Sequence, residues 1–138
     1  MSYAGDVTPS DTFERLTGDD RAVLVDCRTQ AEWSYVGAPD LAPIGKSVIP
    51  IEWSRFPDGA VNADFITQLE EAGVDRSTPV FFLCRSGVRS KAAASAATAA
   101  GWTAAYNISD GFEGPPDEAG HRGTNSGWKV AGLPWKQP

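Results

Sequence analysis

The sequence has 138 residues, of which 41% are hydrophobic and 22% are charged, a balance that excludes a disordered chain. Twelve basic and eighteen acidic residues give a net charge of −6, which disfavours general attraction to nucleic acid or to an anionic membrane. No run approaches the roughly 18 consecutive apolar residues of a membrane-spanning helix. We therefore expect one compact domain over residues 1–138 that binds neither nucleic acid nor membrane.

The first predicted elements are a short strand over residues 6–8 and a helix that follows it. Thr8 is the expected cap of this helix, with Pro9 at its first position and Gly18 at its end. The apolar run 22–25 then has the length of a second strand.

The next stretch predicts a short helix, a loop and a strand. Thr29 and Glu32 have the spacing of a capping box, so we expect a helix over residues 29–35. Two glycines and two prolines within residues 37–45 predict a loop. The apolar run 48–51 predicts a third strand.

The second half of the chain continues the alternation of helices and strands. Apolar residues at helical spacing begin after Asn62 and stop at Gly73. Residues 80–83 and 103–108 predict two further strands, and the seven alanines within residues 91–100 predict a helix between them. Apolar strands separated by helices indicate an α/β fold in which a roughly five-stranded parallel sheet is covered on both faces.

Glycine and proline dominate the end of the chain, with six glycines and four prolines from Gly111 onward. We expect a loop-rich insertion over about residues 114–127 and one short helix over about residues 128–131. The insertion contains the only histidine, His121, which we expect to face solvent rather than to act in catalysis. Because no second ligand lies at metal-binding spacing beside it, we expect no metal site.

The two cysteines, Cys27 and Cys84, have different sequence environments. The first six residues lack the basic and apolar parts of a secretory signal, so we expect a cytoplasmic protein in which both thiols are free. Cys27 lies within a strand pattern, and we expect it to be a buried, inert residue.

The most informative segment is residues 84–90, which reads Cys-Arg-Ser-Gly-Val-Arg-Ser between an apolar strand and the alanine-rich helix. A cysteine in this place meets the backbone N–H groups that lead into the helix, and these groups favour a thiolate over a thiol. Arg85 and Arg89 add positive charge, and the small residues Ser86 and Gly87 let a ligand approach the backbone.

This segment resembles the active-site loop of the rhodanese family of sulfurtransferases. Weaker matches to the family extend over residues 7–134, and they are carried by Asp26-Cys27-Arg28, Glu32-Trp33, 47–50, Asn107, Gly111, Phe112, Trp128 and 132–134. The resemblance implies a three-layer α/β/α rhodanese-like fold and a thiosulfate sulfurtransferase activity that needs no cofactor.

The resemblance also implies roles for individual residues. Cys84 would be the catalytic nucleophile, which takes sulfur from a small anionic donor such as thiosulfate and carries it as a persulfide. A thiophilic acceptor, such as cyanide, another thiol or a protein, would then remove that sulfur. The expected substrate-binding residues are the rest of the loop, namely Arg85, Ser86, Gly87, Val88 and Arg89.

Residues that follow the other strands should surround the cysteine, because ligands bind at the carboxyl ends of parallel strands. Trp33 and Trp53 are candidates for a hydrophobic wall over the thiol, with simple covering of the core as the alternative. We expect Arg28 to be architectural and to pair with Glu32.

Two other functions remain open at this point. One is a sulfur carrier or relay module that works only with a protein partner. The other is a cysteine-based phosphatase or arsenate reductase, which also combines a cysteine loop with an arginine at a helix start. Such phosphatases place five residues between the cysteine and the arginine, whereas four residues separate Cys84 from Arg89, so a smaller anion is favoured.

Overall fold

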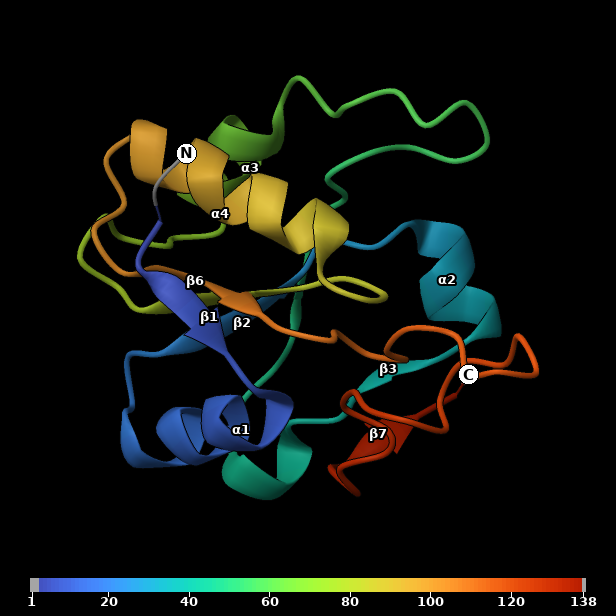
Figure 1. Cartoon of the computed structure of the whole chain (residues 1–138). Helices are drawn as coiled ribbons and strands as arrows, with labels where there is room; N and C mark the ends of the chain where they lie inside the picture. The colour runs from blue at the N-terminus through green and yellow to red at the C-terminus, as the bar shows by residue number, and fades with distance from the viewer. Residues whose placement is uncertain (1–2, 138) are drawn as a thin grey trace.

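The structure is a computed structural model that describes residues 3–137 (Figure 1). Its main sheet consists of five parallel strands in the order β1-β6-β5-β2-β4. The strands are β1 (Gly5–Val7), β6 (Ala105–Ile108), β5 (Val80–Leu83), β2 (Val23–Asp26) and β4 (Ile49–Pro50). This arrangement confirms the predicted α/β class and the predicted parallel sheet.

Helices cover both faces of this sheet (Figure 1). Helix α1 (Pro9–Gly18) lies on one face, and α3 (Phe65–Glu71) and α4 (Val88–Ala99) lie on the other. A further helix, α2 (Gln30–Tyr35), and a short 3-10 helix, η1 (Ala42–Ile44), precede β4. The three layers are those expected of a rhodanese-like fold.

The alternation of side chains along the strands divides the core in two. Val25 of β2 and Phe82 of β5 point toward α3 and α4, where they join the fully buried Ala93 and Ala97. Their neighbours in the same strands point toward α1 and form the second cluster, which includes Leu24, Phe81, Leu83, Leu16 and Ile108. The small alanines explain how α4 packs closely on the sheet.

The position of the site follows from the strand order. The chain leaves β2 toward β4 at one edge and returns to β5 on the other side of β2. Asp26 at the end of β2 is in register with Leu83 at the end of β5, so Cys27 and Cys84 follow side by side. In open parallel sheets, ligands bind at such a reversal of strand order, outside the carboxyl ends of the strands.

Helix starts were predicted well where a side chain caps the helix. Thr8 accepts a hydrogen bond from Asp11 N at the start of α1, and Thr29 and Glu32 form the predicted capping box of α2. Helix α3 begins later than expected, at Phe65 instead of Asn62. The Asn62 side chain accepts from Asp64 N and makes a separate turn before the helix starts.

The short helix expected over residues 128–131 is wrong, because these residues form successive turns. Gly127 and Gly132 on either side have φ angles of 107° and 76°, so the helical backbone cannot extend beyond four residues. The turn buries Trp128 completely, and its indole Nε1 donates to Pro134 O at 2.7 Å.

A small second sheet was missed by the sequence analysis. Strands β3 (Ala38–Pro39) and β7 (Trp135–Lys136) pair in an antiparallel way within what was expected to be loop. No helix or strand occurs in residues 114–127, and His121 within them is exposed, as predicted. None of the helices described in residues 3–137 has the length and apolarity needed to cross a membrane.

Candidate active site

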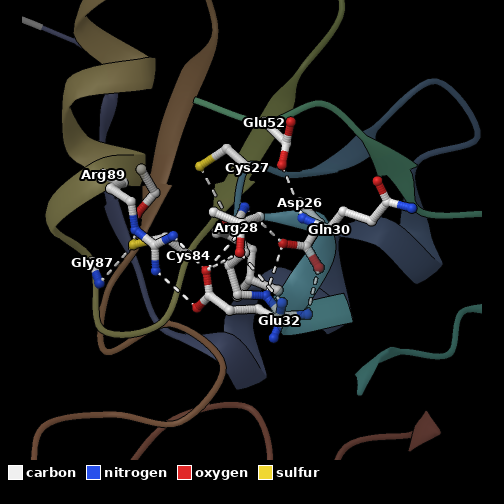
Figure 2. A network of polar contacts seen from close by, with 12 residues as sticks. Asp26, Cys27, Arg28, Gln30, Glu32, Glu52, Cys84, Gly87 and Arg89 are labelled. Carbon is white, nitrogen blue, oxygen red and sulfur yellow. Dashed lines mark hydrogen bonds and ion pairs between the residues drawn. The ribbon is translucent and has the colours of Figure 1, made fainter. Parts of the chain in front are cut away.

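Cys84 lies between the central strand β5 and the first turn of α4. All four residues of β5 are buried, and Cys84 itself is 1% exposed. The backbone N–H of Gly87 points at the sulfur and donates to Cys84 Sγ at 3.1 Å (Figure 2). A sulfur that receives an N–H bond at the start of a twelve-residue helix is in a field that favours negative charge.

Two glycines give the loop its shape. Gly87 is the N-cap of α4 with a φ angle of 109°, a conformation that other residues rarely adopt. Gly111 packs against the backbone of the loop, and a Cβ atom on Gly111 would lie 2.3 Å from Cys84 O. This close approach lets Phe112 N donate to Cys84 O at 2.8 Å and Glu113 N donate to Arg85 O at 3.0 Å. The turn after β6 therefore fixes the backbone of the cysteine loop.

A chain of hydrogen bonds runs from Cys84 to the protein surface. Ser90 Oγ lies 3.2 Å from Cys84 Sγ and donates to Asn107 Oδ1 at 2.6 Å. Asn107 Nδ2 then donates to Asp6 Oδ1 at 2.9 Å, and Tyr3 donates to the same carboxylate oxygen. The hydrogen bond from Asn107, followed by that from Tyr3, lowers the pKa of Asp6, so the chain ends at an ionised group.

The chemistry of Asn107 sets the direction of this chain. Its amide must donate to the Asp6 carboxylate, which leaves its oxygen as the acceptor for Ser90. The single proton of Ser90 is therefore used, so Ser90 Oγ can accept from Cys84 when that group is a thiol. This role of Ser90 and Asn107 was not predicted from the sequence, because the two residues are 17 positions apart and meet only in the fold.

Arg89 forms an ion pair with Glu32 instead of lying free beside the cysteine (Figure 2). The two nitrogens Nη1 and Nη2 donate to Oε1 and Oε2 at 2.6 and 3.0 Å. Burial raises the pKa of Glu32, but hydrogen bonds from Arg89 and from the Thr29 backbone outweigh it and bring the pKa to about 2. The hydrogen bonds that Arg89 donates to Glu32 raise the pKa of Arg89. Arg89 therefore connects α4 to α2.

Arg28 has an architectural environment, as expected, but its partner is Asp26 and not Glu32. It is fully buried, and its Nε and Nη2 atoms donate to Asp26 Oδ1 and Oδ2 at 2.9 and 2.7 Å. Nη2 also donates to Gly37 O, and the guanidinium lies 4.4 Å from the centre of the Phe112 ring. These contacts hold the segment after β2 against the turn after β6.

Cys27 lies beside the site but is buried and hydrogen-bonded. Its Sγ donates to Leu83 O at 3.2 Å, and burial raises the pKa of the Cys27 thiol well above its ordinary range. Both cysteines are free thiols. The raised pKa keeps Cys27 protonated, so it is a poor nucleophile compared with a cysteine that receives an N–H bond.

Two surface cavities border the cysteine loop. One, of about 470 Å³, is lined by Arg85 and Arg89 from the loop and by Tyr35, Arg55 and Phe56 from the segments after β2 and β4. The other, of about 410 Å³, lies on the opposite side of the loop and is lined by Ser86, Gly87, Val88, Asp6, Lys91, Asn107, Ser109 and Asp110. The predicted loop residues are therefore divided between the two cavities.

The two tryptophans expected to form a wall lie in different places. Trp53 packs edge to face on Phe65 at 5.1 Å and contacts the core cluster that contains Cys84. Trp33 lines a separate cavity of about 390 Å³ together with Asp40, Lys46 and Val48. Its buried Nε1 atom has no partner within residues 3–137. Within the same residues, no group of three His, Cys, Asp or Glu side chains could hold a metal ion.

Comparison with known proteins gives relatives over almost the whole chain. The family model described as the STR4 middle domain matches residues 4–138. The uncharacterized protein RC0915 from Rickettsia conorii is 40% identical over 125 residues, which cover 90% of each chain. The rhodanese-like domain-containing protein 4, chloroplastic, from Arabidopsis thaliana is 29% identical over 127 residues, which cover 91% of this chain and 24% of that protein.

Solved structures with the same fold include one similar sequence and one distant sequence. The crystal structure of Rv0390 from M. tuberculosis has 51% sequence identity and a TM-score of 0.90, and the match covers 99% of this chain and 100% of that chain. The polysulfide-sulfur transferase homodimer from Wolinella succinogenes has 20% identity and a TM-score of 0.66, and the match covers 96% and 78% of the two chains. The second match concerns the fold alone.

Proposed function

The chain belongs to the STR4 middle domain family, and from this premise we propose that it is a thiosulfate sulfurtransferase of the rhodanese type with Cys84 as nucleophile. It has rhodanese-like relatives and the fold of a sulfurtransferase. The observation that carries the proposal is the hydrogen bond from Gly87 N to Cys84 Sγ at the start of α4. That bond supports a nucleophilic thiolate.

The proposed reaction has two steps. In the first, the Cys84 thiolate attacks the outer sulfur of thiosulfate, the S–S bond of the donor breaks, and sulfite leaves with the electron pair. Cys84 then carries one extra sulfur as a persulfide. In the second step, a nucleophile such as cyanide attacks this outer sulfur and leaves as thiocyanate, which returns Cys84 to the thiolate. The N–H of Gly87 would stabilise the charged sulfur in each state.

The loop residues have different proposed roles. Arg85 is exposed and lines the larger cavity, so we assign to it the attraction of the anionic donor. Ser86, Gly87 and Val88 would bring backbone N–H groups to the transferred sulfur. Arg89 lines the same cavity, but its pair with Glu32 makes bracing of the loop its main proposed task.

Phosphatase or arsenate reductase activity is less well supported. Only four residues separate Cys84 from Arg89, and the Arg89 guanidinium is engaged by a carboxylate, whereas a phosphatase needs it free to bind the oxyanion. A reducing, cytoplasmic location remains part of the proposal, since both cysteines are free thiols. Two plant relatives are named chloroplastic.

Intact mass spectrometry after incubation with thiosulfate tests the proposal. We expect the protein to gain the mass of one sulfur and to lose it when cyanide is added. Cys84→Ser should abolish this gain, and Cys27→Ser is the matched control that should retain it. Aryl-phosphate hydrolysis by the unmodified protein without any persulfide at Cys84 would contradict the proposal, as would equal losses in the two variants, which would indicate a dithiol mechanism.

A further inference from the structure

Large apolar side chains are exposed around the larger cavity beside the cysteine loop. Tyr35 at the end of α2 is 84% exposed, and Phe56 in the segment after β4 is 71% exposed. Both line the same cavity as Arg85 and Arg89 of the cysteine loop. Exposed aromatic groups next to a reactive centre are typical of a surface that another molecule covers.

The same surface carries positive charge on a chain that is acidic as a whole. Arg55 and Arg85 are exposed, and neither forms an ion pair within residues 3–137. Arg55 donates to the neutral Asn62 Oδ1, and Glu52, which lines a neighbouring cavity together with Arg55, forms no ion pair with it. We define the rim as Tyr35, Arg55, Phe56 and Arg85. Its two charged side chains are both cations, although the net charge of the protein is −6.

The cavity on the other side of the loop has the opposite character. Asp6 and Asp110 line it, with Lys91 as the only cation among its lining residues. Hydrogen bonds from Asn107 and Tyr3 lower the pKa of Asp6, so this side repels an anion. A negatively charged partner therefore approaches Cys84 across the rim.

We infer that the rim docks an acidic segment of a partner protein that carries a cysteine thiol, and that this thiol receives the sulfur from Cys84. The inference rests on the proposed function and names its acceptor. Thiosulfate and cyanide have no apolar surface, so they leave the rings of Tyr35 and Phe56 unused. A peptide with acidic and apolar side chains complements both the arginines and the rings of the rim.

The transfer step fits the burial of Cys84, which is 1% exposed. The outer sulfur of a persulfide lies about 2 Å beyond Sγ, so the partner thiol need not reach Sγ itself. The partner thiol loses its proton to solvent, and its thiolate attacks this outer sulfur. The bond between the two sulfurs breaks, Cys84 leaves as a thiolate, and the partner cysteine becomes the persulfide. No external oxidant or reductant is needed.

Binding can be tested without any sulfur chemistry. The probes are two short synthetic peptides with the same leucine and tyrosine residues, one flanked by aspartates and the other by lysines, each with serine in place of the acceptor cysteine. By calorimetry, the acidic peptide should bind the unmodified protein at least about ten-fold more tightly, and this preference should fall as salt is added. Equal binding of the two peptides would overturn the inference, whether or not a persulfide forms.

Two rim variants separate the apolar and the charged parts of the surface. The double variant Tyr35→Ser with Phe56→Ser should weaken binding of the acidic peptide by about ten-fold. It should leave cyanide-dependent turnover of thiosulfate unchanged. Val130→Ser is the control, since Val130 is also exposed but lines neither cavity beside the loop. Arg55→Glu combined with Arg85→Glu should reverse the preference toward the lysine peptide, a result that misfolding cannot produce.

Sulfur transfer is measured on protein that already carries the persulfide. The acidic peptide with its cysteine restored should remove the sulfur faster than the lysine peptide, and the double variant should lose this difference. If the persulfide does not form, the proposed function fails, while the binding result still decides the docking surface. If the persulfide forms but both peptides react at one rate in every variant, the docking inference fails alone. A dimer that buries Tyr35 and Phe56 would also overturn it.

Discussion

Arg89 on α4 holds Glu32 on α2 through two parallel hydrogen bonds, although the residues are 57 positions apart in the chain. The side chains are only 24% and 19% exposed, so the pair is largely removed from water. Breaking such a pair from one side leaves a charge without its partner, which costs more free energy than the pair itself contributes. Arg89 is therefore a brace between the helix that begins at the cysteine loop and the helix that borders the cavity.

The two arginines of the loop should respond differently to replacement by alanine. Arg89→Ala should lower the free energy of unfolding by about 1–3 kcal/mol, because Glu32 loses its partner. Arg85→Ala should leave stability nearly unchanged and raise the KM for thiosulfate by about ten-fold, because an exposed cation near the cysteine is lost. Denaturant titration and steady-state kinetics measure both effects. A large KM change in Arg89→Ala without loss of stability would show that Arg89 binds the donor.

The Glu32 carboxylate also predicts a pH dependence of stability. Its pKa is about 2 in the folded protein, below the ordinary value of 4.5. A lowered pKa means that the stabilisation is fully present above pH 4.5 and is lost as the pH falls from 4.5 toward 2. The difference corresponds to at most about 3 kcal/mol. Glu32→Gln should therefore flatten the stability curve in this range, and replacement of the exposed Glu118 by Gln should not.

The fold could be predicted from sequence because its signals are local. Thr8 and Thr29 mark helix starts by side-chain caps, and apolar runs of strand length give β2 and β5. The pair β3–β7 could not be predicted, because strands of two residues have no periodicity and pair only when the end of the chain folds back onto the segment after α2. The prediction of a helix near Trp128 was wrong for a different reason. The left-handed backbone of Gly127 and Gly132 on either side stops the helix after one turn.

The candidate site was predicted only in part. Cys84 and its loop are visible in the sequence because strand, cysteine, glycine and helix follow one another. The partners of charged residues are not visible in this way. The four-residue spacing predicted that Arg28 pairs with Glu32. In the structure, Arg28 instead pairs with Asp26 at the end of β2, and Glu32 pairs with Arg89. Long-range ion pairs depend on the tertiary arrangement, which local spacing does not specify.

Gly111 should be intolerant of a side chain. Its φ angle is 58°, and a Cβ atom would lie 2.3 Å from Cys84 O and 2.7 Å from Arg85 O. Both are backbone atoms, which cannot move away without distortion of the main chain. Gly111→Ala should destabilise the protein by about 2–4 kcal/mol and displace the loop, so that sulfur transfer falls in the folded fraction. Gly45→Ala is the control, because Gly45 has a φ angle of 71° with nothing near its Cβ position.

The control should cost only about 1 kcal/mol for its backbone conformation. Denaturant unfolding of both variants measures the difference. Equal losses would mean that the close approach between Gly111 and the cysteine loop contributes nothing beyond the φ angle, and that the loop is positioned by other contacts.

Ser90 should limit the reactivity of Cys84. Its only proton is donated to Asn107 Oδ1, so its oxygen accepts the thiol proton of Cys84 and stabilises the protonated cysteine. Ser90→Ala removes this acceptor, while the N–H of Gly87 still donates to the sulfur. Alkylation of Cys84 by iodoacetamide at neutral pH should then be faster by about three- to ten-fold. Ser95→Ala is the matched control on the same helix, where Ser95 is buried but has no hydrogen bond to Cys84. If alkylation is slower instead, Ser90 donates to the sulfur, and the direction assigned to the chain through Asn107 is wrong.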